Sequence, residues 1–349
     1  MDDGVRARPR RRCLAHVFDG VVPKLPPVSL RGGIDLGGTK IQTVIVDDDN
    51  APLGQARRPT PTSGGPPDVV AEMVAAMRDA AEQAGVKTSG LDRVGVGSPG
   101  GIDAQAGTVT GAGNLPGWQG TFALGQALQD ELKTAVALGN DVQVATDAEA
   151  RLGAGRDYSS MLGVFWGTGV GGGIVLDGKP WLGLGGAGEI GHVVVELGGR
   201  RCPCGRHGCM EAYAGRSALE RHARELHDKG EKTDLFKIAR KRDSERLRSG
   251  IWAAALERKD PLAVKLIDKA VEALGAGVAS VTNVLDVELI ILGGGLGVRL
   301  GQPYADRIEA AMLPHLFHDQ RPPPVKVAEL GDLGGAIGAS LLGTLTGKS

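Results

Sequence analysis

Three of the chain's four cysteines lie within eight residues, in the segment Cys202-Pro-Cys204-Gly-Arg-His-Gly-Cys209. A Cys-x-Cys pair strains as a disulfide, and three thiols cannot all pair with one another. This spacing is typical of a tetrahedral zinc site, in which His192 is a better fourth ligand than His207, which lies inside the loop that the cysteines must close. The sequence therefore predicts a structural Zn²⁺ ion held by one imidazole and three thiolates, with free buried cysteines near a turn as the alternative.

Two glutamates flank the predicted metal ligands. Glu189 lies three residues before His192, and Glu211 lies two residues after Cys209. Neither belongs to a charged run, so folding around zinc is expected to fix both carboxylates in one neighbourhood. Carboxylates fixed in this way suit bidentate hydrogen bonds to vicinal hydroxyl groups. We interpret Glu189 and Glu211 as polyol-binding candidates, with an ordinary exposed surface position as the alternative for each.

Two glycine-rich turns between apolar runs predict a pair of β-hairpins, the first over residues 33–46 and the second over residues 163–176. Glycines in such turns let backbone amides approach a phosphate, because no Cβ lies in the way. Two similar hairpins indicate an internal duplication, in which turns from two related lobes face one nucleotide. The residues expected at the phosphates are Gly37, Gly38, Thr39 and Lys40 in the first turn and Gly167, Thr168 and Gly169 in the second.

Asp35 is the acidic residue of the first turn. It is therefore expected near the phosphates, where a carboxylate can hold Mg²⁺ or its water shell. Neither glycine-rich turn matches the Walker lysine motif or the Rossmann fingerprint, so the predicted nucleotide site belongs to another class of fold.

A third glycine cluster, Gly293-Gly294-Gly295, follows a continuous apolar run over residues 287–292. The run predicts a buried strand, and the stretch 271–285 before it predicts a helix. The glycines are expected either to admit the adenine and ribose of a nucleotide or to form a tight strand-to-helix turn without a ligand.

Asp141 is the best candidate for a catalytic carboxylate. It follows Asn140 at the end of a predicted strand, where an aspartate often serves only as a helix cap. A kinase that phosphorylates an alcohol needs one such base to take the proton as the oxygen attacks the γ-phosphoryl group. Asn140 and Asn114, which lies in the turn Asn114-Leu-Pro-Gly-Trp118, are expected to orient the remaining hydroxyl groups of the substrate.

Three motifs in this order and spacing resemble the ROK family (repressor, open reading frame, kinase): Asp35-x-Gly-Gly-Thr-Lys, Glu189-x-Gly-His192 and Cys202-x-Cys204-Gly-x-x-Gly-Cys209-x-Glu211. The resemblance covers residues 31–345. It implies an α/β protein with the two-lobed actin-like, hexokinase-like ATPase fold, built from duplicated ribonuclease H-like domains and carrying a zinc knuckle. Members of this family are sugar kinases and sugar-responsive repressors.

The resemblance also implies roles for individual residues. Asp141 becomes the catalytic base, and His192 binds zinc together with the three cysteines. The residues that surround the sugar become Asn114, Asn140, Asp141, Glu189, His192 and Glu211. The chain departs from the family where the Asn-Asp pair is commonly followed by Ala-Asn-Ala, because it has Val142-Gln143-Val144 instead. This change is expected to affect the identity of the sugar rather than the activity.

Four segments are expected along the chain. Residues 1–30 form a basic, proline-rich leader, interpreted as a disordered tail or the product of an upstream start, with a nucleic-acid-binding arm as the alternative. Residues 31–141 form a small N-terminal α/β lobe that includes an amphipathic stretch at 69–84, and a final helix in 332–349 packs back onto this lobe. Residues 142–331 form a large C-terminal lobe with the zinc loop and a helical subdomain at 216–268, expected either to form homodimer or higher-oligomer contacts or to be a solvated face.

Composition agrees with an intracellular enzyme that acts on small molecules. The 349 residues include 42% apolar residues and 56 glycines, enough for two α/β cores with many tight turns. A net charge of −1 provides no global attraction to nucleic acid or membrane, and no apolar run is long enough to span a bilayer. Without a secretory signal, a cytoplasmic location is expected.

The resemblance favours an ATP- and Mg²⁺-dependent hexose kinase, most closely a glucokinase that phosphorylates the 6-hydroxyl group, because Asn114-Leu-Pro-Gly-Trp118 resembles the segment of glucokinase-like members. A kinase for N-acetylmannosamine, N-acetylglucosamine or fructose is the nearest alternative, and polyphosphate remains open as a donor. A sugar-sensing repressor would need a helix-turn-helix domain ahead of Asp35, and only 34 residues without helical periodicity precede it. A catalytically dead sugar-binding protein is disfavoured because Asp141 and both turns are intact.

Overall fold

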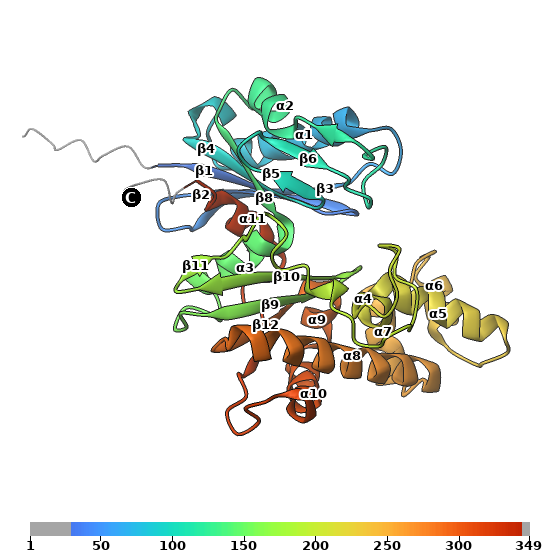
Figure 1. Cartoon of the computed structure of the whole chain (residues 1–349). Helices are drawn as coiled ribbons and strands as arrows, with labels where there is room; N and C mark the ends of the chain where they lie inside the picture. Colours follow the sequence, from blue (N-terminus) through green and yellow to red (C-terminus); the bar gives the residue numbers. More distant parts are fainter. Residues whose placement is uncertain (1–28, 344–349) are drawn as a thin grey trace, which may run out of the picture.

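The computed structural model describes residues 29–343, arranged as two five-stranded β-sheets and one small three-stranded sheet, with helices packed around and between the two large sheets (Figure 1). Residues 1–28 and 344–349 lie outside the described part of the chain, so the predicted leader falls outside it except for Ser29 and Leu30. No helix within residues 29–343 is long and apolar enough to cross a membrane.

The first sheet has five strands in the order β3-β2-β1-β4-β8. β1 pairs with β2 in antiparallel fashion and with β4 in parallel, and β8 extends the parallel part beside β4. The strands are β1 (Arg31–Leu36), β2 (Lys40–Val46), β3 (Pro52–Pro59), β4 (Arg93–Ser98) and β8 (Val136–Asn140). A separate three-stranded sheet consists of β5 (Gly101–Asp103), β6 (Thr108–Thr110) and β7 (Thr121–Phe122).

The second sheet repeats this plan in the order β11-β10-β9-β12-β13. β9 pairs with β10 in antiparallel fashion and with β12 in parallel, and β13 lies parallel beside β12. The strands are β9 (Met161–Trp166), β10 (Val170–Leu176), β11 (Lys179–Pro180), β12 (Leu289–Gly293) and β13 (Val325–Val327). Both predicted hairpins and the predicted internal duplication are therefore confirmed.

Two helices, α3 (Asp141–Leu152) and α11 (Gly334–Ser340), lie between the sheets and pack against each other (Figure 1). α11 covers β1, β2 and β4, and α3 covers β9 and β10. A Cβ on Gly33 or Gly95 would overlap the backbone of α11, so the missing side chains allow the helix to lie directly on the strands. The helix expected in the C-terminal segment is short, because η4 (Gly331–Leu333) precedes it and the chain turns at Gly343, whose φ is 75°.

Further helices cover the outer faces of both sheets. α1 (Pro66–Gln83) packs on β2 and β3, as its predicted amphipathic pattern requires, and α2 (Leu124–Leu132) lies beside it. On the second sheet, α8 (Pro261–Leu285) packs against α10 (Gln302–Met312). The remaining elements are α4 (Glu211–Ala214), α5 (Arg216–Asp228), α6 (Leu235–Lys241), α7 (Ser249–Glu257), α9 (Gly294–Leu300), η1 (Thr88–Gly90), η2 (Ile190–His192) and η3 (Leu313–His315).

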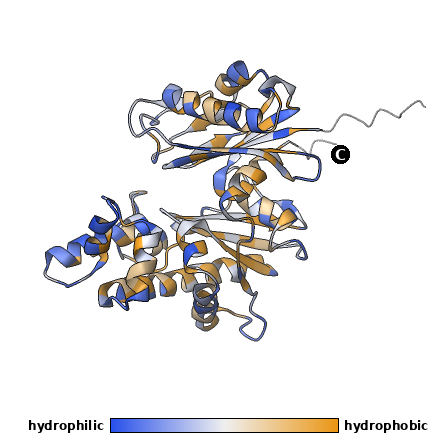
Figure 2. Cartoon of the chain, turned by 180° about the vertical axis from the view of Figure 1, so that it is seen from behind, coloured by the Kyte–Doolittle hydropathy of each residue, from blue (hydrophilic) through white to orange (hydrophobic). Residues whose placement is uncertain are grey.

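Each sheet has its own hydrophobic core. The core of the first sheet centres on residues such as Ile34, Met73 and Met77, whereas Trp166 and Trp252 are fully buried in the core of the second. Figure 2 shows hydrophobic residues along the sheets and the helices that face them, while the α5–α6 region at one side is mostly hydrophilic. With separate cores, the contact between the halves is carried by α3 and α11, which places the residues at the ends of these helices where the halves meet.

Candidate active site and metal centre

Asp141 is the first residue of α3, directly after β8. The helix cap is Asn140, whose Oδ1 accepts hydrogen bonds from the backbone N–H groups of Val142 (3.1 Å) and Gln143 (3.0 Å). Asp141 Oδ1 accepts a second hydrogen bond from Val142, at 2.9 Å. The capping role that the sequence allowed for Asp141 therefore belongs mainly to Asn140, which leaves only the amide nitrogen of Asn140 for a substrate.

Two partly buried carboxyl groups, Asp35 and Asp141, lie close together at one edge of the first sheet. The pKa of Asp141 is raised to about 6, first by loss of solvent and then by the charges of Asp35 and Glu189, while hydrogen bonds from backbone N–H groups oppose the shift. Burial also raises the pKa of Asp35 to about 6, against the opposing effect of Lys40. The sheet topology explains why Asp35 and Asp141 lie close together, because β1, β4 and β8 are parallel neighbours and their carboxyl ends meet at the same edge of the sheet.

The first glycine-rich turn joins β1 to β2 and is closed by a hydrogen bond from Gly37 N to Lys40 O, at 2.9 Å. Thr60 Oγ1 donates a further hydrogen bond to Gly37 O at 2.6 Å. Asn114 lies beside this turn, because a Cβ on Gly38 would be 3.1 Å from its Nδ2. The segment that carries Asn114 is anchored by the buried Trp118. The structure thus brings Asn114 to the first turn.

The second glycine-rich turn joins β9 to β10 and is closed in the same way, with Gly167 N donating to Gly169 O at 3.0 Å. The third cluster lies against it. Gly294 has a left-handed φ of 79°, and a Cβ at this position would be 2.6 Å from the backbone of Trp166. The cluster Gly293–Gly295 forms the strand-to-helix turn between β12 and α9, and it adjoins the second turn.

Glu211 connects the second hairpin to the cysteine cluster. Its Oε2 accepts a hydrogen bond from Val170 N at 2.9 Å, and its Oε1 lies 4.0 Å from Cys202 Sγ. Glu189 is more exposed, and its Oε2 lies 3.8 Å from Nε2 of His192. Both glutamates therefore border the predicted metal ligands, as their positions in the sequence suggested.

The four predicted ligands, His192, Cys202, Cys204 and Cys209, converge so that their ligand atoms all lie within 4.8 Å of one another. Cys204 Sγ lies 3.7 Å from Cys209 Sγ, and Cys202 Sγ lies 3.8 Å from His192 Nδ1. A disulfide needs sulfurs about 2.05 Å apart, so these cysteines are not bonded to one another. His207 is held elsewhere, since its Nδ1 lies 3.0 Å from Gly199 O.

The sequence did not predict the hydrogen bonds of two buried polar residues at this site, Arg216 and Gln143. Arg216 begins α5 and donates a hydrogen bond from Nη2 to Thr168 Oγ1 at 2.8 Å. An arginine in the first turn of a helix interacts unfavourably with the helix dipole, and this unfavourable position is the feature of the sequence that could have drawn attention to Arg216. Gln143 hydrogen-bonds both backbone groups of Ile174 in β10, at 3.0 and 3.1 Å. Gln143, one of the residues at which the chain departs from the family pattern, therefore links α3 to the second sheet.

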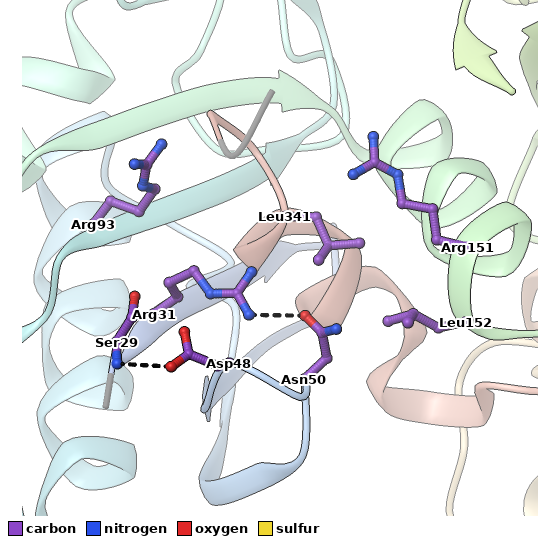
Figure 3. Close-up of a pocket in the computed structure, with 8 residues that line it drawn as sticks. All are labelled: Ser29, Arg31, Asp48, Asn50, Arg93, Arg151, Leu152 and Leu341. Carbon is purple, nitrogen blue, oxygen red and sulfur yellow. Dashed lines mark hydrogen bonds between the residues drawn. The ribbon is translucent and has the colours of Figure 1, made fainter. Parts of the chain in front are cut away.

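A cavity of about 480 Å³ lies away from these residues and contains none of the predicted site residues (Figure 3). Three arginines line it, each with an oxygen partner. Arg31 Nη2 donates to Asn50 Oδ1 at 2.8 Å, Arg93 donates to the carbonyl oxygen of Gly343, and Arg151 pairs with Asp147 at 3.0 Å. These contacts tie strand starts to a neighbouring turn and to the ends of α3 and α11.

Comparisons with known proteins agree with the geometry. The family model of the ROK family matches residues 31–344. A glucokinase of Thermotoga maritima is 33% identical over 303 residues, covering 84% of this chain and 90% of the relative. An N-acetylgalactosamine kinase of a Shewanella species is 33% identical over 320 residues, covering 89% and 96%.

Among solved structures, a ROK family glucokinase from Streptomyces griseus in complex with glucose and AMPPNP has a TM-score of 0.77 at 30% identity, covering 89% of this chain and 98% of that one. A ROK hexokinase from Thermus thermophilus has a TM-score of 0.73 at 32% identity, covering 89% and 97%. Both are consistent with the predicted actin-like, hexokinase-like fold. Because the family model and these similarities extend over nearly the whole described chain, the protein belongs to the ROK family.

Proposed function

We propose that this protein is an ATP-dependent hexose kinase that transfers the γ-phosphoryl group to the 6-hydroxyl group of glucose. The observation that carries the proposal is Asp141, a partly buried carboxylate with its pKa raised to about 6 at the edge where the two sheets meet. A general base works best when its pKa lies near the working pH, because it is then ionised yet still basic. The similarity to glucokinases of known structure supports the same reaction.

In the proposed reaction, Asp141 accepts the proton of the 6-hydroxyl group while that oxygen attacks the γ-phosphorus. The bond between the γ-phosphorus and the β,γ-bridging oxygen breaks, and ADP leaves with both electrons of that bond. Bound Mg²⁺ neutralises charge on the phosphate oxygens, and Asp35 would hold it or its water shell. The backbone amides of the turns 37–39 and 167–169 bind the phosphates, with Lys40 nearby, and residues 293–295 adjoin the adenosine.

The sugar is held by residues from both halves. We assign its hydroxyl groups to Asn114, the amide nitrogen of Asn140, Glu189, Glu211 and Nε2 of His192. The geometry of His192 supports a double role, since its Nδ1 faces Cys202 and its Nε2 faces Glu189. One imidazole can therefore bind a metal through one nitrogen and a sugar hydroxyl through the other.

The cysteine cluster fits zinc. With Zn–S bonds of about 2.3 Å, tetrahedral geometry places sulfurs about 3.7–3.8 Å apart, and the Cys204–Cys209 separation is 3.7 Å. His192, Cys202, Cys204 and Cys209 would fill the shell, so the ion is structural and fixes the loop that carries Glu211. Thiolates that bind zinc must stay reduced, which supports a cytoplasmic location. A homodimer or higher homo-oligomer, with no nucleic acid or membrane partner, completes the proposal.

A kinase for another hexose is the second candidate. The N-acetylgalactosamine kinase relative is as identical to this chain, at 33%, as the glucokinase of Thermotoga maritima. Both polar atoms of the Gln143 side chain form hydrogen bonds with the backbone of Ile174, so they are not available to a sugar. Selectivity for the substituent at carbon 2 of the sugar therefore depends on other residues.

Release of ADP, followed with ATP and Mg²⁺ against glucose, N-acetylmannosamine, N-acetylglucosamine, N-acetylgalactosamine, fructose and mannose, tests the proposal. Turnover with the highest kcat/KM on glucose is the expected result. A higher kcat/KM on an N-acetylated sugar would establish the second candidate instead. No turnover on any sugar, together with a thermal shift caused by one of them, would indicate a sugar-binding regulator and refute the kinase.

A further inference from the structure

Arg216 is a buried cation without a carboxylate partner. Its residue is 9% exposed, and its guanidinium group donates to two uncharged oxygens, Thr168 Oγ1 at 2.8 Å and Leu247 O at 3.2 Å. Glu220 lies near, but its oxygens bind Arg224 at 2.8 Å and Leu247 N at 3.0 Å. Burying a charge is expensive unless an opposite charge accompanies it. Glu220 therefore offsets the charge of Arg216 only from a distance, and no carboxylate within residues 29–343 pairs with Arg216 directly.

Two more arginines approach the same place. Arg216 Nη1 donates to the carbonyl oxygen of Leu247 at 3.2 Å, so Arg246 and Arg248, the chain neighbours of Leu247, lie beside Arg216. In agreement, burial and then the charges of Arg246 and Arg248 lower the pKa of Arg216, whereas Glu220 opposes them. Both side chains are exposed, and neither forms an ion pair within residues 29–343. The loop that carries them is held in place, because Arg224 donates to Glu245 O at 2.7 Å. Three like charges thus share one neighbourhood, an arrangement that an anion with several charges would relieve.

This arginine cluster, Arg216 with Arg246 and Arg248, stands between the second and third glycine-rich turns. Arg216 N donates to Gly167 O at 3.1 Å, and Ser217 N donates to Thr168 O at 3.0 Å, so the start of α5 is fastened to the second turn. The start of α7 adjoins the third turn, since a Cβ on Gly295 would lie 3.6 Å from Ser249 Oγ. The cluster therefore borders the site assigned to the phosphoryl donor.

We propose that the arginine cluster binds the part of the donor's phosphoanhydride chain that is not transferred. Arg216 is a positioning residue that fixes the hydroxyl group of Thr168, and Arg246 and Arg248 contact the phosphate oxygens through their guanidinium groups. The inference rests on the proposed kinase function, because it takes the glycine-rich turns as the donor site. It adds arginine side chains to the backbone amides of the turns as groups that bind the phosphate chain of the donor.

The variant Arg246→Gln/Arg248→Gln tests this assignment, with Arg240→Gln as the matched control. Arg240 is an exposed arginine on α6, six residues before Arg246, so it controls for the loss of positive charge. The double variant is expected to raise the KM for ATP roughly tenfold or more, because each lost charge-assisted hydrogen bond weakens binding substantially. The KM for the sugar and the kcat should change less than twofold, and the control should match the wild type in all three constants.

Competition by inorganic tripolyphosphate separates recognition of the chain from recognition of the base. Tripolyphosphate should compete with ATP in the wild-type enzyme, and its inhibition constant should rise in the double variant by about the same factor as the KM for ATP. Binding of AMP, which has one phosphate group, should weaken less than threefold. Equal KM values for ATP in the double variant and the wild type, or equal losses for AMP and tripolyphosphate, would overturn the inference.

Arg216→Lys tests the positioning role. Lysine keeps the positive charge but cannot reach Thr168 and Leu247 together, so we expect the kcat to fall while the KM for ATP changes less. Arg216→Met removes the charge as well, so we expect both a lower kcat and a higher KM for ATP.

If the wild type shows no turnover on any sugar, the proposed function fails. Calorimetry with AMPPNP still tests the arginine cluster in that case, because wild-type binding must weaken tenfold in the double variant. Absence of AMPPNP and tripolyphosphate binding in the wild type would refute the cluster's assignment as well.

Discussion

At the scale of single residues, Asp141 combines two demands that oppose each other. A base for the 6-hydroxyl group must be ionised at neutral pH, yet burial and the neighbouring carboxylates of Asp35 and Glu189 disfavour its charge. The hydrogen bond from Val142 and the start of α3 only partly offset this effect. The folded protein therefore holds a carboxylate at its active site at the expense of stability.

This conflict predicts that Asp141→Asn stabilises the ligand-free protein at neutral pH. A carboxyl group whose folded pKa is raised from 3.8 to about 6 costs folding free energy once it ionises in the unfolded chain, so the wild type loses stability as the pH rises from about 4 to 6. Because two pKa units correspond to about 3 kcal/mol, the variant should be more stable by about 1–3 kcal/mol at pH 7.5. At pH 4 the difference should nearly vanish.

Urea unfolding of both proteins at the two pH values measures this difference. Asp35→Asn serves as a comparison, because burial raises its pKa to a similar value. A difference between wild type and Asp141→Asn that does not depend on pH would show that the carboxyl group is not strained by burial, and would weaken the assignment of Asp141 as the base.

The roles of single residues were only partly predictable from the sequence. Asp141 and Asn140 were both expected at the substrate, but only the structure shows that Asn140 caps α3 with its Oδ1. Arg216 was not expected at all, because its partner Thr168 is 48 residues away in the chain. Contacts between distant segments leave no local pattern in one sequence, whereas a glycine-rich turn between apolar runs does.

At the scale of elements, the cysteine loop is a short irregular segment that places Glu211 against the second hairpin. Few regular elements support it, since η2 has three residues and α4 has four. The four ligand atoms within 4.8 Å of one another supply the cross-link that hydrogen bonds between such short elements cannot. We therefore expect the proposed sugar binding through Glu189, His192 and Glu211 to depend on the proposed zinc.

Cys204→Ser is expected to reduce bound zinc from about one ion per chain to near zero and to raise the KM for the sugar more than the KM for ATP. The exposed position of Cys204 makes this the ligand whose replacement disturbs packing least. Cys13→Ser, outside the cluster, is the control and should retain full zinc content. Zinc is measured by atomic emission, and the constants come from the ADP-release assay. Retention of sugar affinity without zinc would contradict the proposed coupling.

The elements themselves were largely predictable, because their signals are local. The apolar runs on either side of both turns became β1, β2, β9 and β10, and the amphipathic stretch at 69–84 became α1. The helix expected over 271–285 is longer at its start, where Asp260 caps it and Pro261 begins it. Residues 261–268 belong to the helical subdomain expected at 216–268, so helix was predicted there too, but not its continuity with the stretch 271–285.

At the scale of the whole molecule, two repeated sheets face each other across α3 and α11. Each of these helices begins at a proposed site residue or beside one. α3 starts at Asp141, and α11 starts against Asp35, because a Cβ on Gly335 would lie 2.7 Å from Cγ of Asp35. A change in the angle between the sheets would therefore move the β9–β10 turn relative to the β1–β2 turn and to Asp141. The predicted division into lobes at residues 141 and 142 falls at the start of α3 and remains a prediction.

The central claim is that Asp141 removes the proton of the sugar 6-hydroxyl group in a hexose kinase whose active site is formed by both halves of the fold. The most direct measurement compares wild type and Asp141→Asn by phosphorus NMR of the sugar product, with calorimetric titration of glucose into both. We expect glucose 6-phosphate from the wild type, a loss of turnover in the variant of at least a hundredfold, and glucose affinity within about threefold. Undiminished formation of the 6-phosphate by Asp141→Asn would contradict the account.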